Sequence, residues 1–182
     1  MSVKVAVVVG SLRKGSYNRA VAEALKELAA PRLALEIVEI GDLPLYNADL
    51  DEDPPEPWRR FRQAIAAHRT VLFVTPEYNR SVPAPLKNAL DVGSRPYGQS
   101  VWNDKPAAIV SASPGLIGGF GANHHLRQSL VFLNMPILQQ PEAYLSRIDK
   151  AIDVNGRLSD PRTREFLGKF AEAFADWIER VG

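Results

Sequence analysis

Residues 3–18 read Val-Lys-Val-Ala-Val-Val-Val-Gly-Ser-Leu-Arg-Lys-Gly-Ser-Tyr-Asn. The run from Val3 to Val9 is almost wholly apolar and β-branched, which is typical of a parallel strand that is buried on both faces. After a polar turn, Val21, Leu25 and Leu28 recur at helical spacing and give an amphipathic helix its apolar face. A buried strand, a short turn and an amphipathic helix make one βα unit, so this stretch favours an α/β sheet.

The same alternation of strand and helix continues to the end of the chain. With right-handed crossovers it predicts one domain, residues 1–182, built as a doubly wound five-stranded parallel sheet with helices on both faces. The length matches the flavodoxin-like strand order 2-1-3-4-5. We expect strands at residues 3–9, 33–40, 70–75, 106–112 and 136–138, and helices at residues 16–30, 58–68, 83–93, 126–133 and 161–181. We expect residues 41–57 to form a surface loop that is held to the body by Leu43, Leu45, Tyr46 and Leu50.

The composition narrows the class of protein. The chain holds 22 Lys and Arg against 21 Asp and Glu, so a nucleic-acid footprint is not expected. It has no cysteine, which excludes disulfides, thiolate nucleophiles and cysteine-bound metal sites. Its apolar runs are too short to span a bilayer, its N-terminus lacks a signal-peptide pattern, and its histidines and carboxylates show no metal-ligand spacing. We therefore expect a cytoplasmic enzyme without metal, nucleic-acid or membrane partners.

The turn from Gly10 to Asn18 has the chemistry of a phosphate cradle. It precedes a helix, whose N-terminus offers free N–H groups and a partial positive charge to an anion. Hydroxyls, an amide and a guanidinium can add hydrogen bonds, and Gly15 lets the backbone approach closely. The spacing matches neither a Walker loop nor the dinucleotide fingerprint, and the alternative is an ordinary strand-to-helix turn with a serine cap. The candidate cofactor-binding residues here are Ser11, Arg13, Ser16, Tyr17 and Asn18.

A second polar turn, Pro76-Glu77-Tyr78-Asn79, follows the third expected strand. Once Pro76 has fixed the direction of the chain, the backbone N–H groups of Glu77, Tyr78 and Asn79 can face the pyrimidine edge of a flavin. Donors there stabilise the negative charge of the reduced ring. The alternative is a polar turn with an exposed tyrosine. Because the two turns follow strands one and three, both lie where doubly wound sheets bind ligands, and together they predict a flavin mononucleotide (FMN) site.

A third loop, residues 111–121, leaves the fourth expected strand and is rich in glycine. Glycines suit close packing against a flat ring, and Ser113 and Gly115 are the candidate cofactor-binding residues. A dinucleotide loop is the weaker interpretation, because no acidic residue follows at the expected distance. The serines lack a Gly-x-Ser-x-Gly elbow, which argues against a serine hydrolase. Arg95 and Arg127 are candidate contacts for an anionic substrate, with solvated side chains as the alternative.

Four motifs together resemble the NADPH-dependent FMN reductase family, in particular its quinone and chromate reductase branch. They occur in the family's order and spacing, and the similarity covers nearly the whole chain. The motifs are Gly10-Ser11-Leu12-Arg13-x-x-Ser16-x-Asn18, Pro76-Glu77-Tyr78-Asn79, Pro83-x-x-Leu86-Lys87-Asn88-Ala89-Leu90-Asp91 and Ser113-x-Gly115-x-x-Gly118-Gly119.

The resemblance implies a flavodoxin-like fold, bound FMN, and NADPH or NADH as co-substrate. It also implies homodimers, often paired into homotetramers, with active sites close to a dimer interface to which the helix 83–91 contributes. It places the phosphate at Ser11, Arg13, Ser16 and Asn18, and the isoalloxazine at Pro76, Glu77, Tyr78 and Asn79 with Ser113 and Gly115 beside it.

These observations predict an FMN-dependent NAD(P)H oxidoreductase. We expect NAD(P)H and the oxidant to use one site in turn, by ping-pong kinetics, with a quinone, chromate, an azo compound or free flavin as acceptor. The flavin carries the chemistry, so no catalytic side chain is expected. An electron-transfer flavodoxin is the alternative, but such carriers are usually strongly acidic and this chain has a net charge of +1. A nucleotide-binding relative without redox chemistry is a second alternative.

Overall fold

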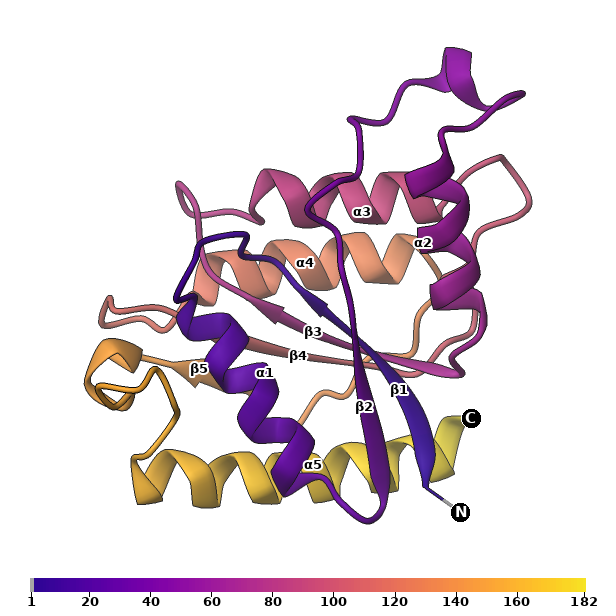
Figure 1. Ribbon diagram of the computed structural model, residues 1–182. Helices are drawn as coiled ribbons and strands as arrows, with labels where there is room; N and C mark the ends of the chain where they lie inside the picture. The colour runs from indigo at the N-terminus through magenta and orange to yellow at the C-terminus, as the bar shows by residue number, and fades with distance from the viewer. Residues whose placement is uncertain (1) are drawn as a thin grey trace.

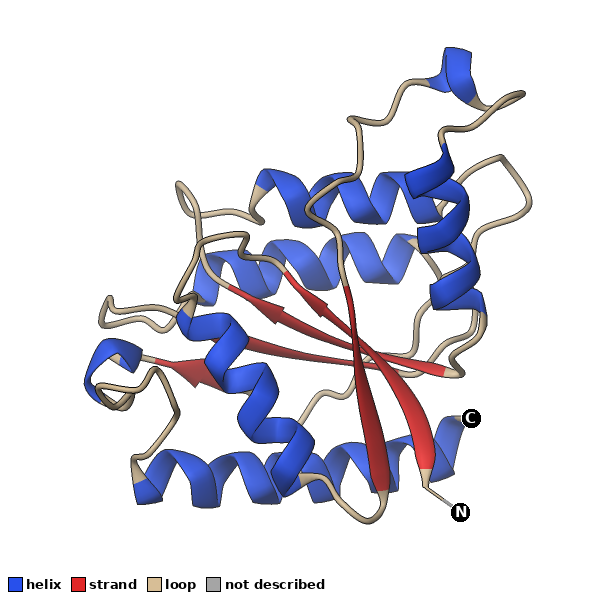
Figure 2. Cartoon of the chain, in the orientation of Figure 1, coloured by secondary structure: helices blue, strands red, loops and turns tan. Residues whose placement is uncertain are grey.

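The computed structural model describes residues 2–182, which form a three-layer α/β arrangement (Figure 1). Five parallel strands lie in the order β2-β1-β3-β4-β5 within this range. Helices α1 and α5 cover one face of the sheet, and α2, α3 and α4 cover the other (Figure 2). The strands are β1 (Val3–Val9), β2 (Leu33–Val38), β3 (Thr70–Thr75), β4 (Ala107–Ala112) and β5 (Ala143–Leu145). The helices are α1 (Tyr17–Leu28), α2 (Glu56–Ala66), α3 (Ala84–Gly93), α4 (Phe120–Phe132) and α5 (Pro161–Val181), with short 3-10 turns η1 (Ala48–Leu50) and η2 (Ile148–Lys150).

The central strand β1 divides the apolar core into two halves. Val5 and Val7 are fully buried beneath α1 and α5, whereas Ala6 and Val8 are fully buried beneath α2, α3 and α4. Successive side chains of a strand point to opposite faces, so one apolar run serves both layers. This arrangement confirms the fold class and the strand order that the sequence predicts.

Two helix starts follow directly from their sequence. The Ser16 hydroxyl accepts a hydrogen bond from the Arg19 N–H at 3.2 Å and caps α1. The Asp160 carboxylate accepts hydrogen bonds from the N–H of Thr163 at 2.8 Å and from its hydroxyl at 2.7 Å. These bonds hold the pKa of Asp160 below its usual value. Pro161 occupies the first helical position of α5, where a missing N–H does not matter.

The expected fifth strand is wrong, because β5 is formed by Ala143–Leu145 instead of residues 136–138. Ile137 does pair with Ala107, but as an isolated bridge: the Ala107 N–H donates to the Pro136 carbonyl at 2.9 Å, and the Leu138 N–H donates to Ala107 at 2.8 Å. The chain then leaves the sheet and returns at Ala143. Helix α4 also begins six residues before the expected position, at Phe120 rather than residue 126.

A long connection, residues 39–55, joins β2 to α2 and is tied down by Asn88 of α3. The Tyr46 N–H donates to Asn88 Oδ1 at 2.8 Å, and Asn88 Nδ2 donates to the carbonyls of Pro44 at 3.0 Å and Leu43 at 3.3 Å. Leu43 and Tyr46 pack against the core as expected. The prediction that Leu45 and Leu50 also anchor the connection is wrong, because Leu45 is 77 % exposed and Leu50 is 37 % exposed.

Candidate functional site

Three loops meet at the carboxyl ends of β1, β3 and β4 (Figure 1). Gly10 brings the first two together: its N–H donates to the Val74 carbonyl at 2.8 Å. A Cβ at Gly10 would lie 2.9 Å from Thr75 Oγ1, so only glycine lets β1 and β3 end this close together. We call residues 10–16 the phosphate loop, residues 76–83 the ring-edge loop and residues 113–119 the third loop.

The phosphate loop presents unused backbone donors. Among residues 2–182, no acceptor receives a hydrogen bond from the backbone N–H groups of residues 11–18. Gly15 adopts a φ of +64°, a left-handed conformation that favours glycine, and turns the chain toward the N-terminus of α1. Free N–H groups at a helix N-terminus form an anion site, so this donor set fits the phosphate of FMN.

Two cations stand beside these donors. Arg13 and Lys14 are exposed and make no ion pair with any residue in the range 2–182, whereas Arg19 is paired with Glu39 at 2.7 Å. The Arg13 guanidinium lies 4.7 Å from the centre of the Tyr17 ring, which holds the cation at the start of α1. Both cations therefore lie close to the start of α1. Contact between Arg13 and the phosphate stays a prediction, and Lys14 is a cation that the motif does not single out.

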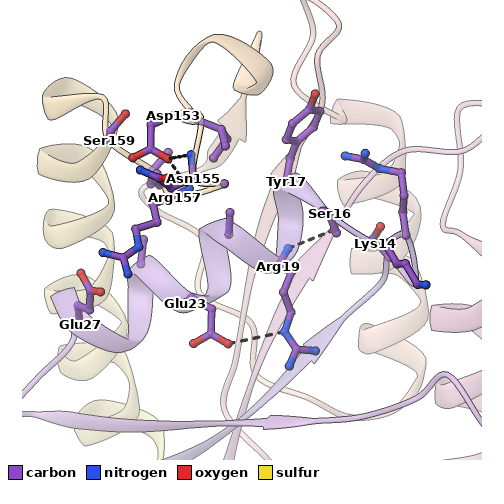
Figure 3. Close-up of a pocket in the computed structure, with 18 of the residues that line it drawn as sticks. Lys14, Ser16, Tyr17, Arg19, Glu23, Glu27, Asp153, Asn155, Arg157 and Ser159 are labelled. Carbon is purple, nitrogen blue, oxygen red and sulfur yellow. Dashed lines mark hydrogen bonds and ion pairs between the residues drawn. The ribbon is translucent and has the colours of Figure 1, made fainter.

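A groove of about 1210 Å³ extends from the phosphate loop along α1 (Figure 3). Its far wall is the segment 152–159, which Asp153 shapes by accepting the N–H groups of Asn155 at 2.8 Å and Arg157 at 2.9 Å. The sequence analysis missed this wall, because a short polar hairpin so distant in the chain carries no local signal. The groove is lined by the phosphate loop but not by residues of the other two loops, so it covers the phosphate end of the site.

Asn18 lies beneath the phosphate loop and is 4 % exposed. Its Nδ2 donates to the carbonyl of Ala112, at the end of β4, at 3.2 Å. Its Oδ1 is buried and has no hydrogen-bond partner within the described chain. One N–H of the amide is thus engaged with β4, and the buried atom without a partner among the described residues is an acceptor. Such an acceptor fits a hydroxyl of the ribityl chain. A bond from Asn18 to the phosphate stays a prediction.

The ring-edge loop keeps fewer free donors than expected. The Tyr78 N–H donates to the Ser81 carbonyl at 3.0 Å and so is not available to a ligand, which corrects the expectation that three consecutive N–H groups face a ring. In the part of the chain that the structure describes, the N–H groups of Glu77 and Asn79 have no acceptor. Pro76 begins this loop directly after β3. Tyr78 is half exposed at the surface, so it is free to cover a planar group.

The third loop is pinned to β5 and η2. The Ser113 N–H donates to the Leu145 carbonyl at 3.0 Å, the Ser113 carbonyl accepts from Ile148 at 3.2 Å, and the Ser113 hydroxyl accepts the Gly115 N–H at 3.1 Å. Beside this fixed turn lie exposed apolar side chains that the sequence analysis did not select. They are Leu116, Ile117 and Phe120, three exposed apolar residues within a stretch of five, and exposed apolar surface of this kind is a candidate contact for a ligand.

The remaining candidate groups have structural partners. Arg127 donates to Asn123 Oδ1 at 3.0 Å and to the Leu138 carbonyl at 3.1 Å, so it is not the free anion contact that the sequence allowed. His124 Nε2 lies 3.0 Å from the Tyr144 hydroxyl, whose pKa burial raises to about 12 with a contribution from a hydrogen bond to Glu142. Residues 2–182 contain no group of histidines and carboxylates that could hold a metal ion, and none of their helices is long and apolar enough to cross a membrane.

Comparison with known proteins gives consistent results. Residues 3–150 match the model of the NADPH-dependent FMN reductase family. A quinone reductase of Pseudomonas putida is 65 % identical over 176 residues, which cover 96 % of this chain and 94 % of that protein. A 2-hydroxy-1,4-benzoquinone reductase of a Burkholderia species is 48 % identical and covers 98 % of this chain and 97 % of its own.

Solved structures agree with this result. The flavoenzyme FerB of Paracoccus denitrificans, an NAD(P)H:acceptor oxidoreductase, superposes with a TM-score of 0.92 at 45 % identity, covering 98 % of both chains. A WrbA-like flavodoxin of Agrobacterium tumefaciens, at 17 % identity and a TM-score of 0.67, shares the fold. The chain therefore belongs to the NADPH-dependent FMN reductase family, whose cofactor suits the donors presented by the phosphate loop.

Proposed function

We propose that this protein is an NAD(P)H-dependent quinone reductase that uses FMN. The observation that carries the proposal is the phosphate loop, which adjoins two loops that can border a flat ring. The backbone N–H groups of its residues 11–16 and the cations Arg13 and Lys14 have no hydrogen-bond or ion-pair partner among residues 2–182. The 65 % identity to a quinone reductase supports the choice of acceptor. The 45 % identity to an NAD(P)H:acceptor oxidoreductase supports the choice of electron donor.

Each region of the site has a separate task. The phosphate loop neutralises the phosphate, and the buried Asn18 Oδ1 accepts a hydroxyl of the ribityl chain. The free N–H groups of Glu77 and Asn79 face the polar edge of the ring, where donors favour its reduced state. FMN, when bound, supplies the capacity to take a hydride from NAD(P)H and to pass two electrons onward.

We propose that exposed apolar side chains at the end of the third loop and the start of α4 position the substrates. Leu116 is 71 % exposed, and Ile117 and Phe120 are each 49 % exposed, beside the turn that would border the ring. Apolar side chains there hold the flat nicotinamide or quinone and exclude water from it. NAD(P)H and quinone use this surface in turn. Because the flavin would carry the hydride and solvent would supply the second proton of the hydroquinone, no side chain is required as an acid or a base. Chromate, azo compounds and free flavin are further acceptors that an open surface of this kind admits.

The proposal includes a homodimer, or a pair of dimers, in the cytoplasm. Apolar side chains on and near α3 and α4 support an assembly: Tyr97 is 92 % exposed, Val131 70 % and Phe132 85 %. On α3, the exposed pair Lys87 Nζ–Asp91 Oδ1 at 2.8 Å lies on the helix that the resemblance assigns to the dimer. Light scattering of the purified protein tests the assembly, and a monomeric mass at micromolar concentration would contradict it.

Steady-state kinetics test the function. Double-reciprocal plots with varied NADPH at several fixed quinone concentrations should give parallel lines, because the two substrates use one surface in turn. Intersecting lines would contradict the shared site. An electron-transfer carrier would reduce no quinone directly from NADPH, so the same assay separates the enzyme from the flavodoxin-type alternative.

A further inference from the structure

The N-terminus of α4 has no cap of its own. Its N-cap residue is Gly119, which has no side chain and a φ of +79°. The carboxylate of Glu77, in the ring-edge loop, supplies the missing acceptor: Oε2 accepts the N–H of Ala122 at 3.1 Å. An anionic acceptor at this position satisfies a helix donor and interacts favourably with the positive end of the helix dipole.

The Glu77 side chain is only 9 % exposed, and both of its oxygens are engaged. Oε1 accepts a hydrogen bond from Arg80 Nη1 at 3.0 Å, while the Arg80 side chain is 75 % exposed. Buried carboxylates need such compensation. Because the oxygens are turned to α4 and Arg80, the carboxylate itself is not free to contact a ligand.

Gly121 shows how closely α4 sits on this loop. A Cβ at Gly121 would lie 2.7 Å from the Arg80 carbonyl oxygen and 2.9 Å from Glu77 Oε2, so a larger residue would separate the two elements. Arg80 itself has a φ of +64°, which turns its carbonyl toward the helix. One turn further along α4, His125 Nδ1 lies 3.0 Å from Ser81 Oγ and makes an exposed outer link.

The far side of the third loop is equally fixed. A Cβ at Gly118 would lie 2.6 Å from the Tyr144 carbonyl carbon, so this loop lies directly on β5. The third loop runs straight into α4, and α4 is capped from the ring-edge loop. The distance between the two loops is therefore set at one end by β5 and at the other by Glu77.

We propose that Glu77 is a positioning residue that clamps the ring-edge loop to α4 and thereby fixes the distance between the ring-edge loop and the third loop. This inference rests on the proposed function, in which these two loops border the flavin ring. It changes the role that the motif gives to Glu77: its backbone N–H faces the ring, while its carboxylate acts through α4.

The test compares Glu77→Ala with Glu77→Gln. Alanine removes the cap, whereas glutamine keeps an oxygen that can accept the Ala122 N–H. We expect Glu77→Ala to raise the FMN dissociation constant by about tenfold, the size expected for a lost charge-assisted hydrogen bond. We expect kcat to fall without a matching change in the KM for NADPH. Glu77→Gln should restore FMN affinity to within about threefold of the wild type. Ser129→Ala, which removes only an exposed hydrogen bond to the His125 carbonyl within α4, serves as the control.

Gly121→Ala provides a second variant that leaves every charge in place. Alanine stabilises a helix more than glycine does. Weaker FMN binding in this variant therefore reports the separation of α4 from the ring-edge loop and not a weaker helix. Amide hydrogen exchange at Ala122, measured without FMN, reports the clamp directly, and protection should fall in Glu77→Ala but not in Glu77→Gln.

The outcomes separate the two claims. A wild-type protein that binds no FMN would overturn the proposed function, whatever the exchange data show. Wild-type FMN affinity and kcat in both Glu77→Ala and Gly121→Ala would overturn the clamp alone. Equal loss in Glu77→Ala and Glu77→Gln would also overturn it, because the charge and not the cap would then matter.

Discussion

The phosphate loop and the ring-edge loop serve one ligand but are built in opposite ways. The phosphate loop and the first two residues of α1 supply donors and cations from one continuous stretch, residues 11–18. Ser16, at the end of the loop, caps α1 directly. The ring-edge loop depends on α4, whose Ala122 is 45 positions away from Glu77. Local chemistry can be recognised in a sequence, whereas a contact between distant segments exists only once the sheet has formed. Substitutions in the two regions test that contrast, from the largest expected effect to the smallest.

Replacing Gly10 with valine should have the largest effect, because Gly10 joins the two regions. Its Cβ would lie 2.9 Å from Thr75 Oγ1 and 3.1 Å from Leu86 Cδ2. We expect overpacking to lower the free energy of unfolding by about 3 kcal/mol and to weaken FMN binding. Urea unfolding measures this change. Gly168→Ala is the control: within residues 2–182 a Cβ there would meet no heavy atom within 4 Å outside its own stretch of helix, and alanine in a helix should stabilise by about 0.5–1 kcal/mol. An unchanged unfolding midpoint in Gly10→Val would contradict the close approach of the strands.

Arg13→Ala removes a cation from the locally built region. We expect the FMN dissociation constant to rise by about tenfold, because one charge-assisted bond to the phosphate is lost. Fluorescence titration with FMN and with riboflavin measures this change, and riboflavin, which has no phosphate, should show no difference between variant and wild type. Arg60→Ala is the control, since Arg60 pairs with Asp42 on the surface at 2.7 Å. Equal losses for FMN and riboflavin would show that Arg13 acts on the ring and not on the phosphate.

Asn88→Ala tests a second contact between distant segments. The change removes the bonds from Asn88 to Tyr46, Leu43 and Pro44. We expect the free energy of unfolding to fall by about 1 kcal/mol, because backbone groups of a largely exposed connection exchange their partners for water. Limited proteolysis should become faster within residues 41–57. Lys169→Ala, which removes an exposed ion pair with Glu165 on α5, is the control, and equal cleavage in both variants would argue against the tether.

Asp160→Asn should have the smallest effect and a defined pH dependence. The folded-state pKa of Asp160 is lowered by its hydrogen bonds to Thr163, so its ionised form stabilises the fold above the unfolded pKa. That contribution is lost as the pH falls through the folded pKa. Asparagine still caps the helix, so the variant isolates the charge. In urea unfolding, the variant should have a lower free energy of unfolding than the wild type at pH 7, and this difference should shrink below about pH 4. A difference that is constant with pH would exclude the carboxylate charge as its source.

The sequence predicts the fold wherever a pattern is local and strong. The strand 3–9 and the N-caps Ser16 and Asp160 are confirmed, because an apolar run and a capping side chain can both be read from a few adjacent residues. The prediction of an edge strand at residues 136–138 is wrong. Ile137 makes only an isolated bridge, and the chain returns to the sheet at Ala143 to form β5. The predicted start of α4 is wrong for a related reason, because the carboxylate that caps this helix belongs to Glu77 and not to a residue next to the helix.

The candidate site follows the same rule. The choice of Ser11, Arg13 and Ser16 comes from one continuous turn, and the structure places all three at the start of α1. The engagement of Asn18 Nδ2 with Ala112, 94 positions away, has no signal in the sequence. The groove wall at 152–159 also lies far from the phosphate loop along the chain. The liganding role of the predicted site residues stays a prediction.

The most direct test is the visible spectrum of the purified protein, recorded before and after NADPH is added without oxygen. The account predicts a yellow protein, or one made yellow by added FMN, that bleaches on addition of NADPH and recovers its colour with a quinone. A yellow protein that NADPH leaves unchanged would contradict the reductase and point to an electron carrier. A protein that takes up no FMN would contradict the assignment of both loops.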